Sequence, residues 1–345
     1  MKKDLLGGLT PREFLRRHWQ KRPLYVRGAL PRFSAVLDAA QLLALARRDD
    51  VESRVVVRRG RSYETEHGPF AAVAAKRRDW TILVSGVNLH HAQADALLRR
   101  FSFIPQARLD DVMVSYATPG GGVGSPVDSY DVFLVQGAGR RRWTVTGGGN
   151  RAVYLAHPGD LLYLPPGWRH DGVALDPCFT YSIGFRAPRG AELGAAFLDW
   201  LHERGLPDTR YRDPGLAPAA GRARIPIHMV RFAERVLRGI KWTRADVAGF
   251  LGEYLSMPKA HVVFRSRPPR RLAGMVRLDL KTQLLYVGAR FFINGDALTV
   301  GARAAGALRA QADQRLAAAS DHARAGLGRL ISEWQRRGYV SIEKR

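Results

Sequence analysis

Bulky apolar side chains at helical spacing follow an N-terminal capping signal near the start of the chain. Phe14 and Trp19 belong to a run whose apolar positions recur three or four residues apart. Thr10 precedes this run, a proline follows it directly, and a glutamate stands three positions later, which together make a capping box. The pattern therefore predicts a helix over 10–20, and a leucine-rich run predicts a second helix over 38–47.

Short apolar runs divided by glycine and proline then continue as far as residue 190. Most runs are four to eight residues long, which suits strands better than helices. We predict one helix in this region, over 92–101, among many short strands. This arrangement is typical of a jelly roll or barrel. The predicted strands cover 53–59, 61–66, 80–88, 112–117, 130–136, 142–146, 160–164 and 180–185.

The pattern becomes mainly helical after residue 190. Helical spacing predicts helices over 191–203, 229–239, 244–254, 301–319 and 324–336, and alternation predicts strands over 274–280, 283–288 and 290–293. Asn294-Gly295 is a strong hairpin turn. A linker rich in proline, glycine and arginine covers 207–226. We expect three domains: 1–190, a helical segment over 191–260, and a small α+β domain over 261–345.

Composition points to a reducing compartment and to an anionic partner. Cys178 is the only cysteine among 345 residues, which excludes a disulfide framework within the chain. No apolar run is long enough for export or for a membrane helix, so we expect a cytoplasmic protein. The net charge is +24, from 47 arginines and eight lysines against 31 acidic residues. Basic clusters at 76–78, 265–271 and 336–337 predict either RNA contact or a solvated basic surface.

Two candidate metal ligands lie where predicted strands meet loops. Asp128 stands between a glycine-rich loop and the strand 130–136, and we expect His170 just after the strand 160–164. Either residue alone could be structural, Asp128 as a turn cap and His170 in an exposed loop. A carboxylate and an imidazole at two strand ends instead suggest a mononuclear iron site, which takes two histidines and one carboxylate. The first histidine of such a site would stand at 126, where the chain has Pro126.

Nine blocks between about residues 9 and 190 resemble, in order, the bacterial ribosomal oxygenases. These are JmjC-type cupin hydroxylases that act on an arginine of a large-subunit ribosomal protein. From about residue 190 the resemblance is one of layout only, a helical dimerisation segment followed by a winged-helix-like end. The blocks are FLRRHWQKRP (14–23), HGPF (67–70), LDDVMVS (109–115), PGGGVG (119–124), YDVF (130–133), GRRRW (139–143), PGD (158–160), PPG (165–167) and SIGFRAP (182–188).

The resemblance implies a fold, cofactors and a set of site residues. The fold is mainly β with α: a double-stranded β-helix, or jelly-roll cupin, followed by the helical segment and the winged-helix-like domain. The implied cofactors are Fe(II) and 2-oxoglutarate, with Asp128 and His170 as iron ligands. Arg141 would bind the distal carboxylate of 2-oxoglutarate, and alternation along a strand would point it inward, away from its two arginine neighbours. Thr180 would line the co-substrate pocket.

Two functions of different class follow from these residues. The first is hydroxylation of a ribosomal-protein arginine by a homodimeric Fe(II)/2-oxoglutarate-dependent enzyme. The second is a pseudo-oxygenase that binds a ribosomal protein or rRNA without turnover, because Pro126 removes an iron ligand. Metal content, compared with that of a Pro126→His variant, would separate the two.

Overall fold

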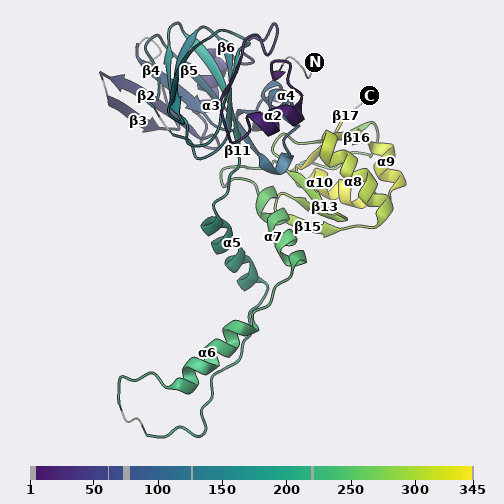
Figure 1. Ribbon diagram of the computed structural model, residues 1–345. Helices are drawn as coiled ribbons and strands as arrows, with labels where there is room; N and C mark the ends of the chain where they lie inside the picture. Colours follow the sequence, from purple (N-terminus) through teal and green to yellow (C-terminus); the bar gives the residue numbers. More distant parts are fainter. Residues whose placement is uncertain (1–4, 61, 73–77, 126, 219–220, 344–345) are drawn as a thin grey trace.

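The chain folds into a β-sandwich body, a projecting helical arm and a C-terminal α+β unit (Figure 1). This computed structural model describes residues 5–60, 62–72, 78–125, 127–218 and 221–343. Pro126 lies outside the described residues, as do two of the three residues of the basic cluster 76–78. None of the helices within the described ranges is both long and apolar enough to span a membrane.

Two antiparallel sheets face each other in the body. The larger sheet has eight strands in the order β1-β9-β6-β11-β5-β4-β2-β3, and the smaller has the order β10-β7-β8. Strands next to each other in the sheet are mostly far apart in sequence, as a jelly roll requires. The strands are β1 Leu24–Val26, β2 Ser53–Arg59, β3 Ser62–His67, β4 Trp80–Val84, β5 Leu109–Ala117, β6 Val132–Ala138, β7 Arg141–Gly147, β8 Asn150–Ala156, β9 Leu161–Leu164, β10 Arg169–Ala174 and β11 Cys178–Phe185.

Alternation along the large sheet separates two buried layers. Phe133 and Tyr163 point outward and pack with Phe14 beneath the N-terminal helices. Leu134 and its inward neighbours pack instead with Trp143 of the smaller sheet. Adjacent side chains of one strand thus point to opposite faces of the sheet. The inner face is the one that lines the cavity between the two sheets. The covering helices are α2 Pro11–Arg17, α3 Ala39–Ala46 and α4 Ala92–Arg99, and short 3₁₀ turns cover Val87–Leu89 and Gln106–Arg108.

Both N-terminal helices begin with a capping box, the first at the predicted capping residue Thr10 and the second at Asp38. The Glu13 amide donates to Thr10 Oγ1 at 3.2 Å, while the Thr10 amide donates to Glu13 Oε2 at 2.8 Å. Asp38 caps α3 through the amide of Gln41 at 2.7 Å. Such a cap typically contributes about 1 kcal/mol to helix stability.

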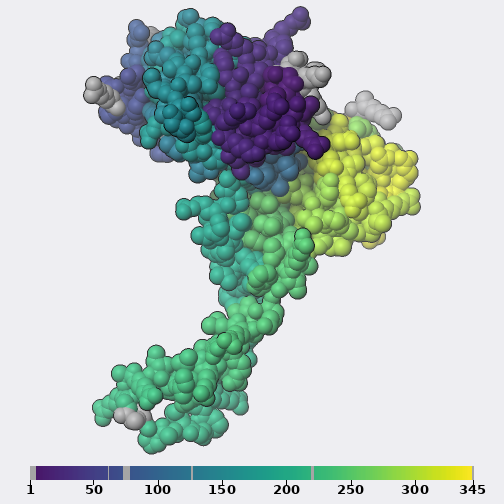
Figure 2. Space-filling view, in the orientation of Figure 1, coloured from purple at the N-terminus to yellow at the C-terminus, as the bar shows by residue number. Residues whose placement is uncertain are grey.

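The arm and the C-terminal unit follow the last strand of the body. The arm is clear in Figures 1 and 2, where α6 extends away from the rest of the molecule. In the predicted linker 207–226, the described residues form no helix or strand. The elements are α5 Gly190–Glu203, α6 Ile227–Gly239, α7 Arg244–Ser256, β12 Met275–Leu278, β13 Leu284–Val287, β14 Arg290–Ile293, β15 Asp296–Thr299, α8 Ala302–Gln314, β16 Leu316–Ala318, α9 Ala319–Arg324, α10 Gly328–Arg336 and β17 Val340–Glu343.

Several predicted boundaries were wrong. The helix predicted over 301–319 ends at Gln314, because Arg315 takes a left-handed conformation (φ 60°) and the next three residues pair with β12. The helix predicted over 324–336 begins only at Gly328. The hairpin turn at Asn294-Gly295 is confirmed: both residues have positive φ, and β14 pairs with β15 across them. Strands β8, β10, β15, β16 and β17 were not predicted, and the three domain limits stay predictions.

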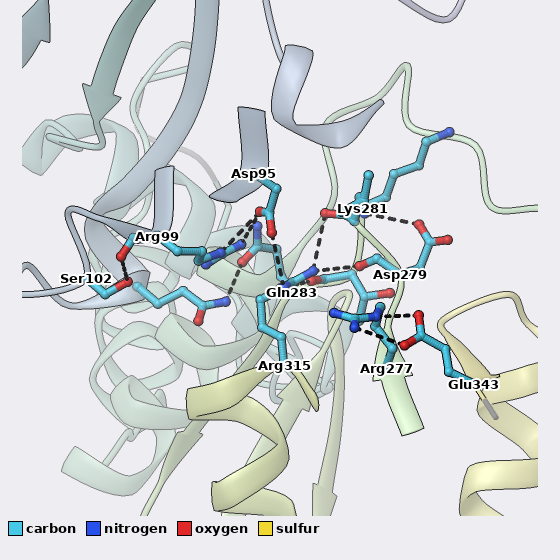
Figure 3. Close-up of polar contacts among 12 residues, drawn as sticks. Asp95, Arg99, Ser102, Arg277, Asp279, Lys281, Gln283, Arg315 and Glu343 are labelled. Carbon is cyan, nitrogen blue, oxygen red and sulfur yellow. Dashed lines mark hydrogen bonds and ion pairs between the residues drawn. The ribbon is translucent and has the colours of Figure 1, made fainter. Parts of the chain in front are cut away.

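Buried Arg315 joins the C-terminal unit to the body. Its guanidinium donates to the carbonyls of Thr282 at 2.9 Å and Asp279 at 2.6 Å, and it lies 3.9 Å from Asp95 of α4 (Figure 3). Burial lowers the pKa of Arg315 to about 10. Because carbonyls on one side and a carboxylate on the other hold this cation, it fixes the two units together.

Candidate functional site

A cavity of about 320 Å³ lies between the two sheets of the body. Its floor and walls are the inward-facing residues of β5, β6, β7 and β11, and its mouth carries most of its charged groups. The residues that line it are Glu52, Arg54, Leu83, Ser85, Asp110, Asp111, Met113, Ser115, Val123, Asp128, Tyr130, Val132, Leu134, Arg141, Trp143, His170, Ser182, Gly184 and Lys259.

The structure brings Asp128 and His170 together although they are 42 positions apart. Two loops are joined locally: Val127 forms a β-bridge with Arg169, and the Gly167 amide donates to the Asp128 carbonyl at 2.9 Å. His170 Nε2 then lies 3.6 Å from Asp128 Oδ2. His170 was predicted just after a strand, but it is the second residue of β10, paired with Val145 of β7. Membership of that strand holds the imidazole at the sheet edge.

His170 is held by its surroundings as well as by its strand. Its Nδ1 lies 3.2 Å from the Trp168 carbonyl, so a proton on Nδ1 would leave Nε2 free to accept or to ligate. The Trp143 ring lies 5.9 Å from the imidazole, centroid to centroid. Gly172 makes room for that ring, because a Cβ at 172 would overlap it. Burial raises the pKa of Asp128, although electrostatic interactions with His170 and Arg54 oppose the shift.

Arg141 points into the cavity as alternation predicted. It is 4% exposed, whereas Arg140 and Arg142 on either side of it are exposed. Its Nη1 donates to Ser115 Oγ at 3.4 Å, while Nε and Nη2 are buried with no hydrogen-bond partner in the described structure. A guanidinium with two unpaired nitrogens in a cavity is strongly disposed to bind a carboxylate, because unpaired buried donors are costly. The geometry therefore fits a carboxylate ligand, and the resemblance implies that this ligand is the distal carboxylate of 2-oxoglutarate.

Thr180 lies in the same inner layer but is not part of the cavity lining. It pairs with Ser115 of β5 and with Gln136 of β6. Its hydroxyl donates to Gln136 Oε1 at 3.1 Å, and the side chain is 1% exposed. Thr180 thus neighbours the residue that holds Arg141, and a direct role in binding the co-substrate stays a prediction.

A pair of carboxylates at the cavity mouth was not identified as functional from the sequence. Asp110 and Asp111 begin the inner run of β5, four to five residues before Ser115, which is about 13–17 Å along a strand. Lys259 Nζ lies 3.2 Å from Asp110 Oδ1 and 3.5 Å from Asp111 Oδ2. The two adjacent aspartates could have been identified from the sequence as a candidate carboxylate pair. Lys259 could not, because it comes from the segment after α7, beyond the arm.

The described residues supply two candidate metal ligands, one fewer than a facial triad uses. Asp128 and His170 suit a divalent metal in chemistry and proximity. Within the described ranges, however, no group of three or more His, Cys, Asp or Glu side chains could hold a metal. The donors present therefore fit iron incompletely, whereas the unpaired nitrogens of Arg141 fit the co-substrate. The expectation from the sequence that the third ligand would stand at 126, where the chain has Pro126, stays a prediction because that residue lies outside the described ranges.

Comparisons with known proteins identify the family of this chain. A family model described as JmjC domain matches residues 96–154 and 151–193. The ribosomal protein uL16 3-hydroxylase of Escherichia coli K12 is 36% identical over 267 residues, which are 72% of this chain and 71% of the relative. This chain belongs to the JmjC ribosomal oxygenase family. A probable ribosomal oxygenase of Haemophilus influenzae is 35% identical over 212 residues, 54% of this chain and 52% of that protein.

Solved structures extend the similarity to the whole fold of this ribosomal oxygenase family member. The E. coli ribosomal oxygenase YcfD matches with a TM-score of 0.83 and 31% identity, over 97% of this chain and 98% of YcfD. YcfD in complex with cobalt and 2-oxoglutarate matches with a TM-score of 0.82 over 96% and 98%. The predicted family and the JmjC, mixed β and α fold class are therefore confirmed.

Proposed function

We propose that this chain is an Fe(II)- and 2-oxoglutarate-dependent oxygenase that hydroxylates an arginine of a large-subunit ribosomal protein. The observation that carries the proposal is buried Arg141, which lines the cavity that also holds Asp128 and His170, and whose Nε and Nη2 have no hydrogen-bond partner in the described structure. In this proposal Arg141 binds the distal carboxylate of 2-oxoglutarate, and Asp128 and His170 hold the metal. The metal, when bound, supplies the oxygen chemistry of the family.

The cavity mouth supports a cationic substrate side chain. Asp110 and Asp111 present carboxylates there, and Glu52 adds a third to the lining. Burial raises the pKa of Asp111, and Lys259 opposes that shift. Paired carboxylates bind a guanidinium through charge-assisted hydrogen bonds. A substrate arginine that entered from the mouth would compete for these carboxylates with Lys259 and Arg186, which already pair with them, while the inner cation, Arg141, stays for the anionic co-substrate.

Pro126 favours a second function, a pseudo-oxygenase that binds its ribosomal partner without turnover. A proline side chain offers no metal ligand, and the described residues provide no substitute histidine, cysteine or carboxylate in a group of three. Under this alternative the cavity retains its co-substrate and substrate sites, and the chain acts as a ribosomal-protein or rRNA binding module.

A turnover assay distinguishes the two functions. The full chain is incubated with Fe(II), 2-oxoglutarate, oxygen and recombinant uL16. The oxygenase proposal predicts succinate in step with the mass of one added oxygen atom on an arginine of uL16. A chain that binds uL16 but forms neither product would overturn the oxygenase proposal and support the pseudo-oxygenase. The E. coli uL16 3-hydroxylase serves as the positive control for substrate quality.

We also propose a homodimer, with the arm as its contact. Helix α6 has no buried residue, and Ile227, Val230 and Leu237 are 59%, 48% and 66% exposed on one side of it. An apolar stripe of this kind is usually covered by a partner. Because the proposed substrate is a ribosomal protein, we place the chain in the cytoplasm and propose rRNA as a second contact of its basic surface.

Charging the arm should convert the dimer to a monomer. The Val230→Asp, Leu237→Asp double variant puts two carboxylates in the proposed contact, where burying unpaired charge is unfavourable by several kcal/mol. Analytical ultracentrifugation should show the unaltered chain as a dimer and the variant as a monomer. The matched control is Val153→Asp with Leu155→Asp, two exposed apolar residues of β8. A monomeric unaltered chain, or equal weakening of the dimer in both variants, contradicts the arm contact.

A further inference from the structure

The segment between α7 and β12 carries an arginine row on a backbone that is hydrogen-bonded to α10. The row consists of Arg265, Arg267, Arg270 and Arg271, all exposed. The Arg267 amide donates to the Arg336 carbonyl at 3.3 Å. Side chains tie the segment down on either side: Ser266 Oγ donates to that same carbonyl at 2.7 Å, and the Arg270 amide donates to Gln335 Oε1 at 2.7 Å.

Two further features restrict this backbone and keep it close to α10. Gly338, with φ +76°, lies so near the Arg265 carbonyl that any side chain there would collide with it. Pro268 and Pro269 restrict the backbone between the two halves of the row. The arginine side chains are therefore mobile groups on a rigid support, and the cost of ordering that backbone is already met in the free protein.

Hollows line both sides of the arginine row. One, of about 220 Å³, lies at the junction with the body, and another, of about 210 Å³, lies against β17. Arg267 lines both, so the hollows meet at the row. A third hollow, of about 560 Å³, continues past Arg265. We call these three hollows with the row the basic groove, and its other cationic residues are Arg48 and Lys281.

The basic groove has an excess of positive charge. The junction hollow is lined by four Arg or Lys residues against one carboxylate, Asp279, and the hollow against β17 by two arginines and no carboxylate. The third hollow has three such cations against two carboxylates. Within the described part of the chain, no ion pair takes any of the four arginines of the row. Burial and the neighbouring cations Arg48 and Lys281 lower the pKa of His90, which lines the junction hollow, to about 4.

We propose that the basic groove binds the phosphate backbone of RNA. From Arg265 to Arg271 the chain spans at most about 20 Å, and a nucleic-acid strand carries a phosphate about every 3.4 Å along its axis. Guanidinium groups bind phosphate oxygens in a bidentate manner, which suits a row of arginines better than a row of lysines. A recessed linear groove fits a polyphosphate chain, whereas a membrane surface requires a flat face with inserted apolar groups.

This surface deepens the proposed rRNA contact and rests on it for the choice of RNA as the polyanion. It is independent of turnover. The Arg141 cavity and the basic groove share no lining residue. Loss of hydroxylation would therefore leave RNA binding intact, and loss of RNA binding would leave uL16 hydroxylation in solution intact.

Salt-dependent RNA binding by matched triple variants tests the groove. The probe is a fluorescein-labelled single-stranded 20-mer of uridine, and anisotropy is measured on the full chain between 0.05 and 0.5 M salt. Arg265→Ala, Arg267→Ala, Arg270→Ala should reduce the log–log salt slope by about 2, or about 0.7 for each phosphate that is no longer neutralised. If the RNA affinities of the unaltered chain and the triple variant become equal near 1 M salt, the affinity of the variant near 0.1 M salt should be about 100-fold lower.

The control removes the same charge elsewhere on the surface. Arg12→Ala, Arg142→Ala, Arg151→Ala takes three exposed arginines that form no ion pair in the described chain, and it should change affinity by less than about threefold if the groove is the main phosphate site. Circular dichroism checks the fold of both variants. Equal reductions in the two variants, or no salt-dependent RNA binding by the unaltered chain, overturn the proposal. The proposal is also overturned if the groove variant loses binding to phosphatidylserine vesicles but binds RNA as the unaltered chain does.

Discussion

Arg141→Ala should lower the affinity for 2-oxoglutarate by about 30- to 1,000-fold. Removing one partner of a buried, hydrogen-bonded charge pair costs about 2–4 kcal/mol. The estimate applies here because Arg141 is 4% exposed and two of its guanidinium nitrogens have no protein partner in the described structure. Isothermal titration calorimetry of the full chain, with and without cobalt, measures the change. A decrease of similar size in both conditions places the effect on the co-substrate rather than on the metal.

Two matched variants show whether this decrease comes from the guanidinium. Arg142→Ala removes the same side chain from the outer face of β7 and should leave the affinity within about threefold, since an exposed charge contributes little. Arg141→Lys keeps the charge but cannot bind a carboxylate in the two-pronged manner, so we expect an intermediate affinity. Unchanged binding to Arg141→Ala would show that 2-oxoglutarate, if bound, is held elsewhere.

The orientation of Arg141 could be predicted because it depends on local rules. Alternation along one strand decides which of three consecutive arginines faces inward, and the structure confirms that choice. The capping box at Thr10 and the Asn294-Gly295 turn were predictable for the same reason, since each depends on a few adjacent residues. His170 was predicted to follow a strand, whereas it lies within β10, which pairs with β7. The six residues of β10 include a histidine, an aspartate and a glycine, and their sequence does not show the alternation that predicts a strand.

Features that depend on distant segments could not be predicted. Lys259 reaches Asp110 and Asp111 from 148 positions along the chain, as 259 − 111 gives, and nothing near Lys259 in sequence indicates it. The helix predicted through Arg315 ends early for a related reason. The Arg315 side chain is buried at the junction with the body, where it contacts backbone carbonyls and Asp95. Helix propensity in an alanine-rich run depends on local sequence and does not reflect such tertiary contacts.

Pro126→His should raise the affinity for cobalt or Fe(II) by at least about 10-fold. Loss of even an outer-shell partner of a metal ligand typically costs 10- to 100-fold, so gain of a direct ligand should matter at least as much. The described donors, Asp128 and His170, are two of the three that a facial triad uses. Cobalt titration, followed by its visible absorption and by calorimetry, compares the variant with the unaltered chain.

Ser125→His and Ser129→His are the matched controls for the Pro126→His experiment. Each adds an imidazole beside the site but away from the His-x-Asp position, and both serines are exposed. A rise in affinity specific to Pro126→His identifies residue 126 as the missing ligand position, and recovery of uL16 hydroxylation with it would show that the rest of the site is intact. If the unaltered chain already binds one metal per chain as tightly as the variant does, two protein ligands suffice here, and the case for a pseudo-oxygenase fails.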